Sequence, residues 1–109
     1  MGLRSRRKGH SFEREIAIEL KKMGFKDACR KLEYQECDAT GVDIKNCGNF
    51  KIQCKRGKQY APISKIKEIK EDGIHLLVTK KDRDETIVCL YWKDFKKILT
   101  DIGVAYENL

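Results

Sequence analysis

The sequence predicts an α/β fold in which a mixed β-sheet is flanked by helices, with the elements in the order αβββαββα. Apolar residues recur at helical spacing over residues 12–23, alternating runs flank a Gly- and Asn-containing segment at 46–49, and residues 74–79 are almost wholly apolar. A chain of 109 residues is the size of one domain. We expect residues 1–10 to be a flexible basic arm and residues 11–109 to form that domain.

The N-terminal half is expected to contain a helix followed by three strands. The first helix covers residues 12–23, with Ser11 as its N-cap and Gly24 just beyond its C-terminus. A first strand is predicted at 28–32. The next two strands, at 41–45 and 50–55, flank Asn and Gly residues and therefore form a hairpin.

The C-terminal half is expected to contain a helix, two strands and a last helix. The helix begins near Pro62 and ends at Gly73, where the apolar strand 74–79 starts. This strand is typical of one that is buried on both faces. A strand at 86–91 and a helix at 93–100 follow. The residues of the last helix that we expect to face the core are Phe95, Ile98 and Leu99.

Positive charge is concentrated in two segments. Lys and Arg number 24 against 17 acidic residues, a net charge of +7, and neither residues 1–9 nor residues 51–58 contain an acid. Such an excess attracts polyanions, of which nucleic acid is the commonest. The candidate phosphate contacts are Arg4, Arg6, Arg7, Lys8, Arg30, Arg56 and Lys58. A solvated basic surface is the alternative.

Neither a membrane nor an oxidising compartment is predicted. No apolar stretch is long enough to span a bilayer, and the first residues have no apolar core of a signal peptide. The five cysteines are an odd number without CxxC spacing. We therefore expect reduced thiols in a cytoplasmic protein. The alternative is a structural zinc site made by Cys29, Cys37, Cys47 and Cys54.

Glu13 lies inside the apolar stripe of the first predicted helix. At about 100° per residue, it falls between Ile16 and Ala17 when Phe12 is placed at zero. A carboxylate on this face costs free energy unless it is paired or holds a cation. The alternative is an ion pair with a lysine at the edge of the stripe.

The hairpin places a second carboxylate, Asp43, beside Gln53 and Lys55 if its loop has three residues. Gln53 and Lys55 share one face of their strand because they are two residues apart. A two-residue loop would put Asp43 beside Ile52, whereas the loop 47–49 puts it opposite Gln53. Gly48 and Asn49 favour the longer loop, or a bulge of the same parity.

A carboxylate, an amide oxygen and an ammonium on one face, with a helical glutamate nearby, suit phosphodiester chemistry. Oxygen ligands from Asp43, Gln53 and Glu13 fit Mg²⁺, with Mn²⁺ as a substitute. The metal would activate water, and Lys55 would orient that water or stabilise charge on the phosphate. The four residues are therefore the candidate catalytic set.

The segments "SFEREIAIELKKMGF", "GVDI" and "IQCKRG" together resemble the PD-(D/E)xK nuclease superfamily, whose core has the restriction-endonuclease-like fold. The resemblance covers most of the chain. It implies that Glu13, Asp43 and Gln53 bind metal, that the carbonyl of Cys54 completes the metal shell and that Lys55 is catalytic. Val42 stands where the motif usually has proline, and Gln53 replaces the usual acid, as in the Mrr-like branch.

The small size and basic N-terminus resemble archaeal or phage Holliday junction resolvases. This resemblance implies a homodimer that cuts branched DNA, and one 12.7 kDa domain reaches only part of a junction. Tyr91 and Trp92 are expected to pack in the core or in such a dimer. An Mrr-like endonuclease acting on duplex DNA and a non-catalytic nucleic-acid-binding module are the alternatives.

Overall fold

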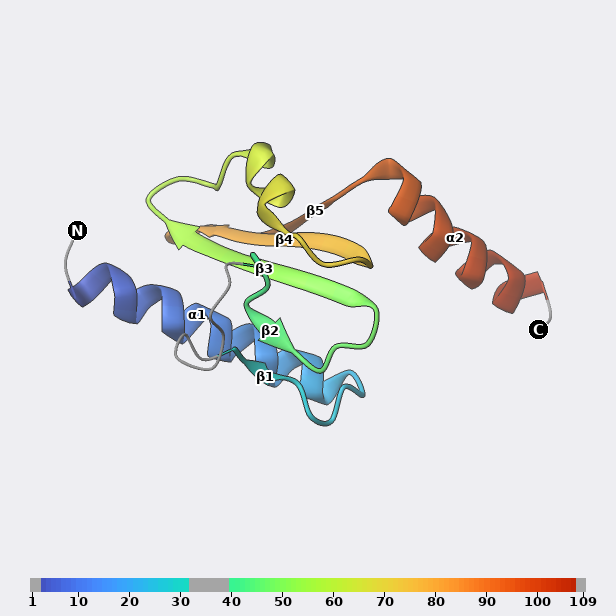
Figure 1. Cartoon of the computed structure of the whole chain (residues 1–109), viewed down its shortest axis with the longest axis horizontal. Helices are drawn as coiled ribbons and strands as arrows, with labels where there is room; N and C mark the ends of the chain where they lie inside the picture. Colours follow the sequence, from blue (N-terminus) through green and yellow to red (C-terminus); the bar gives the residue numbers. More distant parts are fainter. Residues whose placement is uncertain (1–2, 32–39, 108–109) are drawn as a thin grey trace.

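The chain forms one five-stranded mixed sheet with a long helix at each end of the sequence (Figure 1). In this computed structural model residues 3–31 and 40–107 are described, with side chains at 7–31 and 40–103. The elements are α1 (Leu3–Lys22), β1 (Cys29–Arg30), β2 (Ile44–Lys45), β3 (Phe50–Gly57), the 3₁₀-helix η2 (Ile63–Glu68), β4 (Ile74–Lys81), β5 (Thr86–Leu90) and α2 (Trp92–Glu107). The strands are ordered as numbered, and only β3 and β4 are parallel. The predicted α/β class and element order are confirmed.

Helix α1 begins at Leu3, so the prediction of a flexible arm is wrong for residues 3–10. Arginine and lysine are good helix formers, and in this segment only Gly9 strongly opposes helix formation. Lys8 also donates to Asp82 in the β4–β5 turn, with 2.8 Å between Nζ and Oδ2. The basic segment is thus a helical extension fastened to the far end of the sheet.

The second predicted helix is a short 3₁₀-helix rather than a long α-helix. Ile63, Ile66 and Ile69 recur every three residues, which is the period of a 3₁₀-helix. Ile66 and Ile69 are buried, whereas Ile63 is exposed. The segment therefore needs only one turn or two to cover its face of the sheet.

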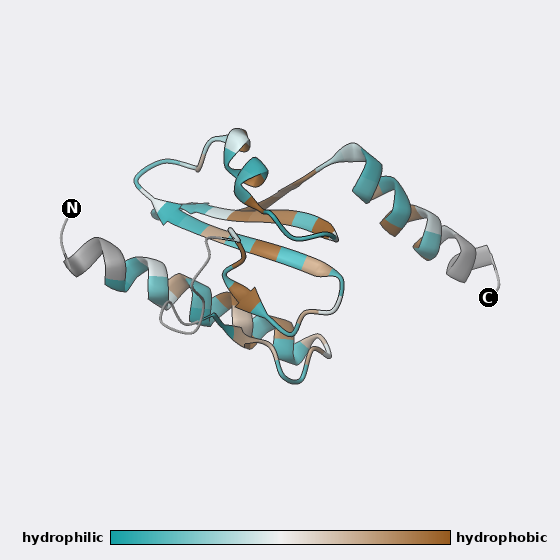
Figure 2. Cartoon of the chain, in the orientation of Figure 1, coloured by the Kyte–Doolittle hydropathy of each residue, from teal (hydrophilic) through white to brown (hydrophobic). Residues whose placement is uncertain are grey.

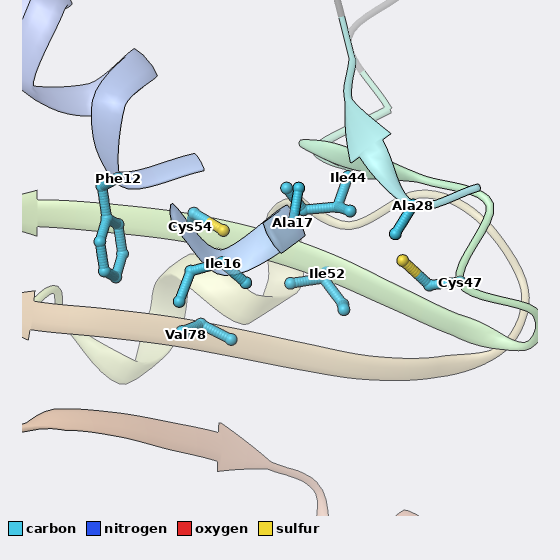
Figure 3. Close-up of a cluster of buried hydrophobic side chains, with 9 residues drawn as sticks. All are labelled: Phe12, Ile16, Ala17, Ala28, Ile44, Cys47, Ile52, Cys54 and Val78. Atoms are coloured by element: carbon cyan, nitrogen blue, oxygen red, sulfur yellow. The ribbon is translucent and has the colours of Figure 1, made fainter. Parts of the chain in front are cut away.

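The sheet has a core on each face. On the α1 face the buried cluster is Phe12, Ile16, Ala17, Ala28, Ile44, Cys47, Ile52, Cys54 and Val78 (Figure 3). On the η2 face it is Val42, Ile66, Ile69 and Leu77. Leu77 and Val78 are neighbours in β4 and enter opposite clusters, which confirms that this strand is buried on both faces.

Helix α2 projects away from the sheet instead of closing over it (Figure 1). The expectation that its apolar residues face the core is wrong for Phe95 and Leu99, which are 39% and 44% exposed, and Ile98 is only partly buried. The chain is correspondingly elongated. Its radius of gyration is 14.7 Å, whereas a compact domain of this length has a radius of about 13 Å. Neither described helix contains a stretch long and apolar enough to cross a membrane.

Candidate functional site

The β2–β3 hairpin has the register that the parity argument requires. Ile44 pairs with Ile52, which is the predicted even sum of residue numbers, and the regular ladder stops there because the Asp43 amide donates to the carbonyl of Ile52 rather than of Gln53. The amide of Phe50 donates to the carbonyl of Cys47 at 3.1 Å, so the tight turn spans Gly48 and Asn49 alone, and the parity comes from one extra residue on the β2 side, the bulge that is the alternative to a three-residue loop. The left-handed residues of the hairpin are Asn46 and Gly48, with φ of 65° and 61°. The predicted pairing of the two strands is confirmed.

Asp43 is held by main-chain bonds on both sides of its strand. Its amide donates to the carbonyl of Ile52 and its carbonyl accepts from the amide of Lys31, both at 2.8 Å. Its side chain accepts a third bond, from the Cys54 amide to Oδ2 at 2.8 Å. The carboxylate is therefore fixed at the edge of β3, just beyond the end of β2.

Gly41 allows the main chain just before Asp43 to lie against the main chain at the end of η2. It has φ of 78°, and a Cβ there would lie 2.2 Å from the main-chain oxygen of Glu68. The amide of Lys70 also donates to the carbonyl of Thr40 at 2.7 Å. Only glycine permits this contact, which fixes the chain before Asp43 against the end of η2.

Glu13 faces the same region from α1, as predicted, but its partner is an arginine. Arg30 Nε donates to Glu13 Oε2 at 2.8 Å, and the two side chains are only 12% and 15% exposed. Burial raises the pKa of Glu13, the nearby Asp43 carboxylate raises it further, and Arg30 partly offsets both effects. The structure thus brings two carboxylates together and adds an inward-turned arginine.

Three cations surround the Asp43 carboxylate. Burial raises the pKa of Asp43, while the Cys54 amide, Lys55, Lys31 and Arg30 act to lower it. Together with Glu13 this group contains three positive and two negative charges. It therefore attracts an anion such as phosphate while keeping carboxylate oxygens for a cation.

Gln53 carries an unpaired buried oxygen. The residue is 2% exposed, and its Nε2 donates to Glu68 Oε1 at 3.0 Å. This bond fixes the amide, and Oε1 has no hydrogen-bond partner among the described residues. A buried carbonyl oxygen without a donor costs free energy, which is recovered if a donor or a cation reaches it.

Glu68 was not among the predicted site residues. It accepts from Gln53 and from Lys65, whose Nζ lies 2.9 Å from Oε2, and these bonds lower its pKa. Lys55 contributes to the same lowering, so its ammonium lies near both Asp43 and Glu68. The 3₁₀ period pairs Glu68 with Lys65, but no sequence pattern connects it with Gln53, fifteen residues away.

The oxygen donors of this site fit a hard divalent cation. Asp43 and the Cys54 carbonyl border one edge of β3, because the amide and carbonyl of a strand residue point the same way, and the side chain of Gln53 lies on the η2 face beside them. Within residues 3–31 and 40–107, no three His, Cys, Asp or Glu side chains gather around a common point. A cation here would therefore depend on an amide and a main-chain oxygen as well as on carboxylates.

The described cysteines do not assemble the alternative zinc site. The Cys54 thiol lies in the α1-face core, and burial followed by the Asp43 and Glu13 charges raises its pKa, so it stays protonated. Cys47 is buried and Cys29 is exposed. Cys37 lies outside the described residues.

The predicted phosphate contacts fall into different environments. Lys8 and Arg56 share one acid, Asp82, at 2.8 and 3.3 Å, and Arg30 is turned inward to Glu13. Arg7 and Lys58 are exposed on the surface. The side chains of Arg4 and Arg6 lie outside the described residues. The two ends of the basic surface, in α1 and at the end of β3, are thereby joined through Asp82.

The region consequently contains the four predicted residues, Arg30, which was predicted as a phosphate contact and instead pairs with Glu13, and Glu68, which was not predicted. No protein-family model, curated protein or solved structure matches this chain.

Proposed function

We propose that the protein is a metal-dependent endonuclease that hydrolyses phosphodiester bonds in DNA, with branched DNA such as a Holliday junction as its preferred substrate. The observation that carries this proposal is the position of the Asp43 carboxylate, which accepts a hydrogen bond from the amide of Cys54, the residue between Gln53 and Lys55 in β3, and lies near the charges of Lys55 and Glu13. A carboxylate, an amide oxygen and an ammonium in this order are what the resemblance to PD-(D/E)xK nucleases implies. The proposal includes their restriction-endonuclease-like core.

Asp43, Gln53 and the Cys54 carbonyl would hold Mg²⁺ or Mn²⁺. The unpaired Oε1 of Gln53 supports this assignment, because a cation would satisfy a buried oxygen that has no described donor. When bound, the metal polarises the phosphate and makes water more acidic. Glu68 keeps the amide of Gln53 turned so that its nitrogen is occupied and its oxygen is available.

The remaining residues of the site would position the phosphate and balance its charge. Lys55 stabilises negative charge on the phosphoryl oxygens or orients the attacking water. Arg30 holds Glu13 at 2.8 Å and keeps one positive charge beside the two carboxylates. Lys8 and Arg56 bind the backbone of the nucleic acid without reading its sequence. None of these four side chains needs to contact a base.

The test is cleavage of a matched set of DNAs, a four-way junction and linear duplexes of the same sequence, with and without Mg²⁺. We expect metal-dependent cleavage of the junction and loss of cleavage in Asp43→Asn, with junction binding retained. Asp72→Asn, at an exposed site, is the matched control. Preferential cutting of linear or modified duplex would instead indicate an Mrr-like enzyme, and cleavage by Asp43→Asn at the wild-type rate would refute the assigned site.

A non-catalytic nucleic-acid-binding module is the second candidate. It is favoured by the Arg30–Glu13 pair, which neutralises one predicted ligand, and by the lack of a three-ligand group in the described part of the chain. Calorimetric titration with Mg²⁺ and Mn²⁺ separates the two functions. The nuclease gives a binding signal that Asp43→Asn removes, whereas the module binds DNA and gives no such signal.

A further inference from the structure

An apolar groove lies between the outer strands of the sheet and α2. Its lining residues are Leu76, Val88, Leu90, Trp92, Phe95 and Ile98. Val88 pairs with Val78, a member of the α1-face core, and Leu90 pairs with Leu76, which packs against that core. The groove therefore lies on the face of the sheet that α1 covers elsewhere.

The exposed apolar residues of α2 follow the spacing of a helix-pairing seam. Trp92, Phe95, Leu99 and Ile102 are separated by three, four and three residues, which are alternate a and d positions of a heptad. Their exposed fractions lie between 39% and 66%. A seam of this kind packs against another helix, and the chain's other long helix, α1, already packs on β1 and β3. The described residues contain no further long helix, so a matching helix would come from another molecule.

Charge distinguishes this surface from the rest of the protein. Residues 86–107 contain three lysines and three acids, so they are neutral in a chain with net charge +7. β5 has no charged residue, and Figure 2 shows it as an apolar stretch leading into α2. A neutral surface gives no attraction for a polyanion and no repulsion between identical copies.

β5 is also an unprotected edge of the sheet. It is the last strand in the order, its sequence is Thr-Ile-Val-Cys-Leu, and Ile87 and Val88 are 40% and 53% exposed. Edge strands usually carry lysine, proline or a bulge that prevents pairing with other chains. β5 has neither residue along its five positions, which is consistent with an edge covered in the working protein.

We propose that a second copy of this chain covers this surface, with α2 of each copy packed along the heptad seam of the other and its apolar residues in the neighbouring groove. A two-fold arrangement uses the same patch on both partners. This inference does not rest on the nuclease proposal, since neither metal nor nucleic acid enters it. It assigns a surface to the homodimer expected from the sequence.

Sedimentation equilibrium of the full chain tests the proposal. The wild type should reach a plateau at twice the chain mass of 12.7 kDa, while Phe95→Glu and Leu99→Glu should remain at 12.7 kDa. The matched control is Ile18→Glu, at an exposed apolar site on α1, which should stay dimeric. Far-ultraviolet circular dichroism shows that each variant is folded; because both variant sites are exposed in the single chain, neither change should unfold it.

The single tryptophan gives an independent readout on the same surface. Trp92 is 66% exposed in the single chain, so the proposal expects its emission to shift to longer wavelength and its quenching by acrylamide to rise on dilution. Phe95→Glu should show the diluted spectrum at every concentration. A monomeric wild type, a mass that grows without a plateau, or dissociation by Ile18→Glu alone would overturn the proposal.

Discussion

The two ends of the sheet are built on opposite principles. Around Asp43, at the β1–β3 end, charged groups are numerous, half-buried and tied to one another, as in the Arg30–Glu13 pair. At the β5–α2 end the side chains are neutral and apolar, and Trp92 and Val88 are more than half exposed. The first end therefore suits small ions, whereas the second suits apolar contact. The difference shows that the single chain satisfies many of its charged groups internally but leaves part of its apolar surface exposed.

The largest expected effect contrasts two phenylalanines. Phe12 is 1% exposed in the α1-face core and Phe95 is 39% exposed. We expect Phe12→Ala to lower the free energy of unfolding by about 3–5 kcal/mol. At dilutions where the chain is monomeric, Phe95→Ala should change it by less than about 0.5 kcal/mol. Urea unfolding of both variants gives the comparison, and equal losses would mean that α2 is already packed in the monomer.

The next largest effect distinguishes a lysine of the candidate site from a lysine of the surrounding basic surface. Lys55→Ala should lower the cleavage rate on the order of 10²–10³-fold, because the positive charge that stabilises the reacting phosphate is lost. The control is Lys67→Ala, an exposed lysine of η2. Single-turnover rates at saturating DNA measure the chemical step apart from binding. Equal rates in the two variants would remove Lys55 from its assigned role.

A smaller loss is expected from the residue that holds the amide of Gln53. Glu68→Ala should lower metal affinity or activity by about 10–100-fold, since it frees Gln53 Nε2 and with it the orientation of Oε1. Lys65→Ala keeps the Gln53–Glu68 bond and removes only an exposed ion pair, so it should be nearly neutral. The Mg²⁺ concentration for half-maximal cleavage measures the effect. A general loss of folded protein would lower the maximal cleavage rate without changing this concentration.

The smallest expected effect is a gain in stability. Burial raises the pKa of Asp43 above its usual 3.8, so the ionised carboxylate destabilises the folded state, fully so above the folded pKa and not at all below the unfolded one. At pH 7 Asp43→Asn should therefore raise the free energy of unfolding, on the order of 1 kcal/mol. The gain should vanish at acid pH. Denaturant titrations at several pH values check this, with Asp72→Asn as the unchanged control.

Local patterns predicted the frame of the molecule but not its pairings. Helical spacing placed Glu13 on the buried side of α1, and the parity of the hairpin paired Ile44 with Ile52. Both depend on neighbours in sequence. The bonds of Glu13 with Arg30 and of Gln53 with Glu68 depend on tertiary packing, which no periodicity encodes. The exposure of α2 escaped prediction for a related reason, because an apolar stripe fits a core and an interface equally well.

Asp82 would affect how strongly the binding of a polyanion near it depends on salt concentration. Its carboxylate already neutralises Lys8 and Arg56 and has a lowered pKa because of them. A phosphate that captures these two cations leaves Asp82 to attract a cation from solution. Fewer ions are then released than the number of basic groups engaged, so the salt dependence of binding should be shallower than that number predicts. The acid is thus an internal counterion for Lys8 and Arg56, which a bound polyanion would have to displace.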